Sequence, residues 1–140
     1  MDLVVKGKFP APVDQGAVGR EWAGRGYDCR LFVDPPGREW NGFVHATNEL
    51  VTVVEGALLC TVEINAVEIN AVEINAVEIN TVEINAVEIN AVEINAVEIN
   101  AVEKKTIRLE MGDELFIPRD AVHSVKNIHT GTTRWLFGYD

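Results

Sequence analysis

Cysteine is scarce in this chain of 140 residues, which contains only Cys29 and Cys60. The two residues do not form a Cys-x-x-Cys pair, and they are too few to build a disulfide framework. A fold that depends on disulfide bonds is therefore excluded. We expect both cysteines to be buried free thiols with no chemical role.

Long apolar segments are also absent from the sequence. No run approaches the roughly 18 apolar residues that are needed to cross a bilayer. The first six residues, Met1 to Lys6, lack the long apolar stretch of a secretion signal. We therefore expect a cytoplasmic protein that has no membrane partner.

Positively charged residues are also few. The chain has 12 Lys and Arg against 22 Asp and Glu, and nine of the acidic residues recur at every fifth position from Glu63 to Glu103. Outside this stretch the charges nearly balance, so no basic patch remains to hold a nucleic-acid backbone. We do not expect nucleic acid as a partner.

A repetitive tract interrupts the chain. Residues 61–100 are eight consecutive copies of a five-residue unit, x-Val-Glu-Ile-Asn, and a ninth copy begins at Ala101. Such uniformity indicates a recent natural expansion or deliberate construction, so the tract need not have been selected for an activity. We divide the chain into a discontinuous domain, residues 1–60 and 104–140, and an inserted tract, residues 61–103.

The repeat unit fits a short strand followed by a bend. Val-Glu-Ile places two apolar side chains on one face and Glu on the other, and Asn and Ala suit a corner. This pattern resembles that of pentapeptide-repeat proteins, whose units stack into a four-sided β-helix, and it favours solenoid-like coils. A hairpin-like extension, disorder and intermolecular β-pairing remain as alternatives.

The remaining sequence has the features of an all-β domain. Short segments rich in β-branched and aromatic residues alternate with turn-forming residues such as those at Pro35 to Gly37, and no segment predicts a helix. Many short strands at close spacing favour a sandwich or barrel. The expected strands are 28–33, 50–54, 57–60, 106–109, 114–117 and 133–138.

Two histidines and one glutamate are the candidate metal ligands. His45 is followed four residues later by Glu49, and His123 lies in the second part of the discontinuous domain. Two imidazoles and one carboxylate can bind a divalent metal on one side and leave positions open for water or substrate. The same residues would equally serve as polar groups in a metal-free cavity. We expect His129, in a turn, to be an exposed loop residue.

These segments resemble the two conserved motifs of the cupin superfamily, G(X)5HXH(X)3–4E(X)6G and G(X)5PXG(X)2H(X)3N. The first runs from Gly37 through His45 and Glu49 to Gly56, and the second runs from Gly112 through His123 to Asn127. The resemblance implies a double-stranded β-helix barrel of the jelly-roll type. It also implies a bound Fe, Mn, Zn or Ni ion, and a homodimer.

Two positions depart from the cupin motifs. Phe43 stands where the first motif has its first histidine, and Asp120 replaces the glycine of the second motif. The loss of one ligand predicts either a three-ligand metal site or a metal-free cavity for an apolar molecule. Asp120 is expected to adopt the turn conformation that glycine would supply.

Aromatic residues near the motifs are the candidate lining of a ligand cavity. They are Trp40, Phe43, Phe116 and Trp135. We expect a small-molecule ligand in this cavity. The sequence supports three hypotheses for the function: a metal-dependent enzyme, a metal-free binding protein, or a scaffold whose repeat drives assembly. It identifies no catalytic residue.

Overall fold

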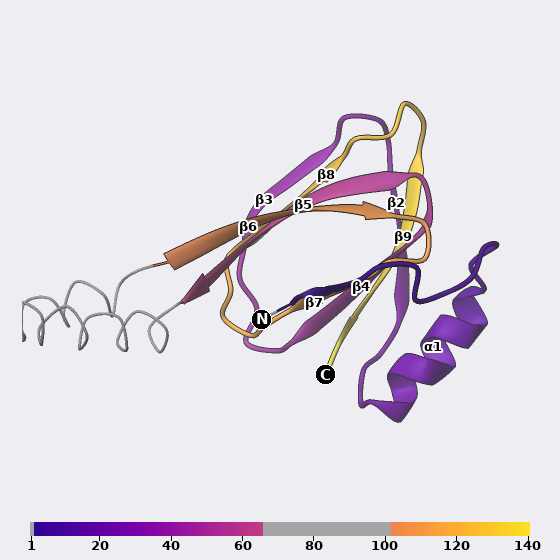
Figure 1. Ribbon diagram of the computed structural model, residues 1–140, viewed down its shortest axis with the longest axis horizontal. Helices are drawn as coiled ribbons and strands as arrows, with labels where there is room; N and C mark the ends of the chain where they lie inside the picture. The colour runs from indigo at the N-terminus through magenta and orange to yellow at the C-terminus, as the bar shows by residue number, and fades with distance from the viewer. Residues whose placement is uncertain (1, 66–101) are drawn as a thin grey trace, which may run out of the picture. The chain divides into compact units, whose positions relative to one another are not determined.

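The structure is a computed structural model that describes residues 2–65 and 102–140 (Figure 1). The predictions for the middle of the repeat, whether solenoid coils, hairpin or disorder, lie outside the described residues. The elements are β1 (Val4–Val5), α1 (Gln15–Gly24), β2 (Arg30–Asp34), β3 (Glu39–Phe43), β4 (Glu49–Glu55), β5 (Ala57–Asn65), β6 (Val102–Glu110), β7 (Glu114–Ile117), β8 (His123–Asn127) and β9 (Thr133–Tyr139).

The strands form two sheets that pack as a β-sandwich of the jelly-roll kind. One sheet has the order β1-β7-β4-β9-β2 and the other has the order β3-β8-β5-β6. The pairings of β4 with β7 and β9, of β2 with β9, and of β8 with β3 and β5 are all antiparallel. The strands expected from the sequence are confirmed, whereas β1, β3 and β8 were not predicted: β1 is only two residues long, and polar residues and Gly42 obscure the alternation in β3 and β8.

The helix α1 contradicts the expectation that the chain has no helix. Asp14 caps its first turn, because the carboxylate accepts hydrogen bonds from the backbone N–H groups of Gly16 and Ala17. Glycines within the helix lowered its predicted propensity. Packing outweighs this cost, since Val18 and Trp22 lie four residues apart on one helix face and are fully buried. In the described residues no helix is long and apolar enough to cross a membrane.

The strand β4 is buried on both of its faces. Val18 and Trp22 of α1 form a core cluster with Leu50 of β4 and Leu136 of β9, which covers one face of the first sheet. Residues that pair directly across antiparallel strands share a face, and neighbours along a strand alternate. Glu49 therefore projects from the opposite face of β4, toward the second sheet.

The repeat begins inside the second sheet. Thr61 pairs with Ser124, and Val62 pairs with His123. Val62 is fully buried, as are Leu58 and Cys60 on the same face of β5. One compact unit consists of Met1–Val62 with Lys105–Asp140. The first residues of the repeat thus belong to the core of the sandwich.

Neither cysteine forms a disulfide bond. Cys29 is half-buried and Cys60 is buried. Burial raises the pKa of the Cys60 thiol to about 12, which keeps it protonated at neutral pH. Cys60 therefore behaves as a small apolar core residue.

A buried carboxylate joins α1 to the first sheet. Glu114 of β7 accepts hydrogen bonds from the Trp22 indole at 2.8 Å, from Arg25 at 2.9 Å and from Lys8 at 3.0 Å. Burial alone would raise the pKa of Glu114, but these donors hold it below its ordinary value of 4.5. The charged form of Glu114 therefore stabilises the folded state.

Replacing Glu114 with Gln should lower the free energy of unfolding at neutral pH by about 1–3 kcal/mol, because the cations lose their charged acceptor. Since the folded pKa is depressed, the contribution of Glu114 is present above pH 4.5 and is lost as pH falls through the folded pKa. Urea unfolding across this range measures both effects. Glu21→Gln, at a more exposed partner of Arg25, is the control. An equal dependence on pH in wild type and Glu114→Gln would contradict this account.

Candidate metal centre

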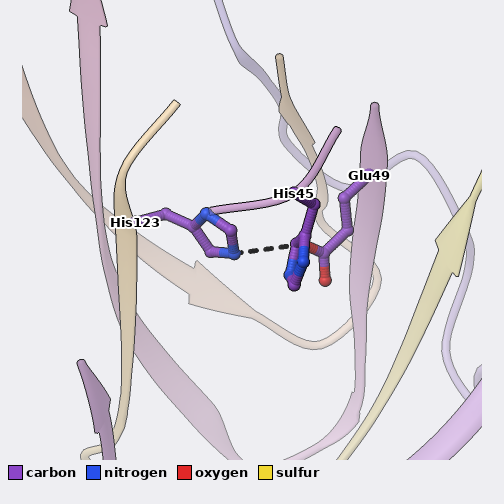
Figure 2. A group of neighbouring side chains, drawn as sticks. All are labelled: His45, Glu49 and His123. Atoms are coloured by element: carbon purple, nitrogen blue, oxygen red, sulfur yellow. Dashed lines mark ion pairs between the residues drawn. The ribbon is translucent and has the colours of Figure 1, made fainter. Parts of the chain in front are cut away.

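The three predicted ligands come together at one end of the sandwich. His45 lies in the connection between β3 and β4, Glu49 is the first residue of β4, and His123 is the first residue of β8. One nitrogen or oxygen atom from each lies within 4.8 Å of the others. Figure 2 shows the side chains of His45, Glu49 and His123 pointing toward one another. Segments far apart in the sequence thus form one potential metal-binding group.

The Glu49–His123 distance matches that expected between two ligands of a shared ion, and the Glu49–His45 distance is slightly longer. Glu49 Oε2 lies 3.2 Å from His123 Nε2 and 3.7 Å from His45 Nε2. Two atoms that each bind an ion at about 2.1 Å lie about 3.0–3.5 Å apart. Glu49 and His123 are each 4% exposed, whereas His45 is partly exposed. Access to the group is therefore through the side of His45.

A backbone carbonyl orients the His123 ring. His123 Nδ1 lies 3.0 Å from the Ala121 carbonyl oxygen, to which its N–H donates. This hydrogen bond directs Nε2 toward Glu49, as in many histidines that bind metal. Burial lowers the pKa of His123, but the Glu49 carboxylate and the Ala121 carbonyl outweigh burial and raise it above its ordinary value.

The Glu49 carboxylate supports the presence of a cation. Its Oε2 atom is buried and has no hydrogen-bond partner, although it faces two imidazole nitrogens. An unpaired buried charge costs several kcal/mol, so such an atom is expected to meet a positive charge. Two imidazole nitrogens and one carboxylate oxygen suit a divalent transition metal and leave coordination positions open. The residues present therefore fit a metal ion.

An aromatic cavity of about 150 Å³ adjoins the three residues. Of the side chains predicted to line it, Trp40, Phe43 and Trp135 do so. Phe116 does not, because it pairs with Leu50 and lies on the face of the first sheet that packs against α1. The lining residues are Phe32, Trp40, Phe43, His45, Glu49, His123, Val125, Trp135, Phe137 and Tyr139.

One buried carboxylate holds two walls of the cavity. Asp34, the last residue of β2, is fully buried and accepts hydrogen bonds from Trp40 Nε1 at 3.0 Å and from Trp135 Nε1 at 2.9 Å. The Phe32 ring contacts both indoles, with its centroid 5.4 Å from that of Trp40 and 5.6 Å from that of Trp135. These contacts fix both indole rings, so the aromatic walls are rigid.

Part of the lining was not predicted from the sequence. Phe137 and Tyr139 follow Trp135 at two-residue intervals in β9, and Phe32 pairs directly with Trp135. The alternation of three aromatic residues over 135–139 was the available signal, because residues two apart in a strand share a face. It indicates that one strand supplies an entire aromatic wall.

Other motif residues have structural roles. Asp120 adopts a φ of 64°, which confirms the expected glycine-like turn. The Asn127 side chain donates to the Asp34, Pro35 and Gly131 carbonyls. His129 is exposed in a turn, as expected. These residues shape the loops around the sandwich and lie outside the cavity lining.

Comparison with known proteins supports the fold. No protein-family model matches the chain, and no curated protein matches it in sequence. Similar solved structures include oxalate decarboxylase from Lactobacillus farciminis, with 16% identity, a TM-score of 0.51 and coverage of 81% of this chain and 23% of that one. Drosophila melanogaster CENP-C bound to CAL1 has 9% identity and a TM-score of 0.53, with coverage of 80% of this chain and 60% of that one.

A third similar structure is Bacillus subtilis oxalate decarboxylase, described by its Mn(II) centres, with 16% identity and a TM-score of 0.50. The match covers 81% of this chain and 21% of that one, so this chain spans only part of each of these proteins. At such low identities the similarity shows the fold. This chain shares the jelly-roll β-sandwich fold of these neighbours, and its His/Glu/His group lies within metal-binding distance.

Replacing Asp34 with Asn should loosen the aromatic walls. Only one oxygen remains to accept from two indole N–H groups, so we expect a loss of about 1–3 kcal/mol in the free energy of unfolding. Tryptophan fluorescence should shift to longer wavelength as the indoles gain mobility and water. Denaturant unfolding and emission spectra measure these effects, with the exposed Glu39→Gln as control. Unchanged stability and emission would show that Asp34 does not hold the walls.

Proposed function

We propose that this protein binds a divalent metal ion through His45, Glu49 and His123, and a small molecule in the adjacent aromatic cavity. The observation that carries the proposal is the buried, unpartnered Oε2 atom of Glu49, which lies 3.2 Å from His123 Nε2 and 3.7 Å from His45 Nε2. A cation at this position satisfies the carboxylate and both nitrogens together. Metal binding is therefore expected to stabilise the fold.

The residues around the ion would select and orient the ligand. The cavity lining described above includes six aromatic side chains and no Lys or Arg. It therefore favours a ligand whose part inside the cavity is planar or apolar, and it offers no cation to an anionic group of the ligand there. When bound, a divalent ion supplies a Lewis acid with open coordination positions. The partly exposed side of His45 gives the ligand access to these positions, and the aromatic walls exclude water from its apolar part.

A protein of similar fold contains a metal. Bacillus subtilis oxalate decarboxylase is described by Mn(II) centres, which places manganese among our candidates together with iron, zinc and nickel. The donor set of two imidazoles and one carboxylate accommodates each of these ions. We propose a metal-dependent enzyme as one form of this function.

A metal-free binding protein is the second candidate, and Phe43 favours it. The Phe43 ring stacks on His45, with an interplanar angle of 18° and centroids 6.1 Å apart. Phe43 thus occupies a position at which a metal-binding side chain would strengthen a metal site. The raised pKa of His123 would then reflect a charged pair with Glu49. In a metal-free binding protein, the cavity would bind an apolar ligand without a metal ion.

Several expectations from the sequence stay predictions. They are the homodimer, assembly through the repeat, the absence of nucleic-acid and membrane partners, the cytoplasmic location, and the limits of the inserted tract. None of them enters the argument for the metal centre, which depends on three side chains and the cavity beside them.

Metal analysis of the purified full chain tests the proposal. We expect about one divalent ion per chain after loading, and its loss in His45→Ala and in His123→Ala, because each variant removes one of three ligands. His129→Ala is the matched control, since His129 is the exposed third histidine, and it should retain the ion. Absence of bound metal under all loading conditions would falsify the metal-binding function and favour the second candidate.

Replacing Phe43 with His should tighten metal binding. The Phe43 ring centroid lies 6.0 Å from that of His123 and 6.1 Å from that of His45, so an imidazole there adds a donor beside the existing ones. We expect the dissociation constant for Zn(II) to fall by at least the roughly 10-fold that a supporting partner of a metal ligand contributes. Isothermal titration calorimetry measures the change, and Phe43→Leu controls for loss of the ring. Equal affinities in wild type and Phe43→His would argue against this site.

A further inference from the structure

Tyr139 brings a fourth donor atom, its phenol oxygen, to the three candidate ligands. In the first sheet Tyr139 of β9 pairs directly with Glu49 of β4, so both side chains project from the same face into the cavity. The Tyr139 ring meets the His45 ring edge-on at 68°, with centroids 4.9 Å apart. Its hydroxyl oxygen lies 3.3 Å from His45 Nε2.

The contact between Tyr139 and His45 depends on whether His45 Nε2 binds a metal ion. Without a metal, His45 Nε2 and the hydroxyl can share a hydrogen bond. Once an ion occupies the Nε2 lone pair, the nitrogen no longer accepts a proton from the phenol. The phenol oxygen is then left at a distance typical of two ligands of one ion, about 3.0–3.5 Å.

The backbone holds Tyr139 at this place. Its N–H donates to Asp28 Oδ1 at 2.8 Å, and its carbonyl accepts from the Asp28 N–H at 3.1 Å. The preceding residue, Gly138, has no room for a side chain, because a Cβ atom there would lie 1.8 Å from the Asp28 carbonyl oxygen. The end of β9 is therefore fixed against the start of β2, and the phenol is directed into the cavity.

We propose that Tyr139 is the fourth protein ligand of the metal, in place of the histidine that Phe43 replaces. This inference rests on the proposed function, since it requires an ion at His45, Glu49 and His123. Binding as a phenolate breaks the O–H bond, forms a metal–oxygen bond and releases the proton to solvent, with no change in oxidation state. A hard trivalent ion such as Fe(III) favours this ligand most strongly.

Fe(III) gives the assignment an optical signature. A phenolate bound to Fe(III) produces a charge-transfer band in the visible range, which imidazole and carboxylate ligands do not produce. The chain contains two tyrosines, so Tyr27→Phe is a matched control for Tyr139→Phe. We expect the full chain loaded with Fe(III) to be coloured, Tyr27→Phe to keep the band, and Tyr139→Phe to lose it while still binding iron.

Resonance Raman scattering from the wild-type protein provides a readout that does not depend on the folding of a variant. Excitation in the visible band should enhance the ring vibrations of a bound phenolate. A colourless Fe(III) complex, or a band that survives in Tyr139→Phe, overturns the assignment of Tyr139 and leaves the three-ligand site intact. A wild-type chain that binds neither Fe(III) nor a divalent ion overturns the proposed function, and this inference with it.

Discussion

A buried carboxylate that requires a positive partner is the constraint on which this structure depends. Glu49 is 4% exposed and its Oε2 atom has no hydrogen-bond partner. The cost of an uncompensated buried charge is large, so a cation must meet it, either a metal ion or protonated His123. The first alternative also uses His45 and the open cavity beside it. A protein that needed only a stable core would place an apolar residue at this position.

The architecture positions this carboxylate through the two faces of β4. Leu50 projects toward α1 and is covered by Trp22, and the preceding residue of the strand, Glu49, therefore projects into the sandwich. The helix thus has a role beyond covering apolar surface, because it closes the outer face of the first sheet. The inner face is then free to carry polar groups at the end of the sandwich and aromatic groups beside them.

Much of the candidate site could be predicted because its residues lie in local motifs with fixed spacing. His45 and Glu49 share one motif, and turn residues such as Asp120 mark the other. Alternation along strands then predicts which side chains share a face. The register between strands was not available from the sequence, so the pairing of Glu49 with Tyr139 could not be foreseen. The helix was missed for a similar reason, since Trp22 stabilises it through contacts with distant strands.

The arrangement also accounts for the departure at Phe43. An aromatic ring there stacks on His45 and extends the apolar lining, which exchanges one metal donor for ligand-binding surface. Anomalous diffraction from crystals soaked in Mn(II) or Zn(II) tests the central claim most directly. The account predicts a metal peak about 2.0–2.3 Å from an imidazole nitrogen of His45 and of His123 and from a Glu49 oxygen. An empty site at saturating metal, with the carboxylate hydrogen-bonded to a protonated His123 instead, would contradict it.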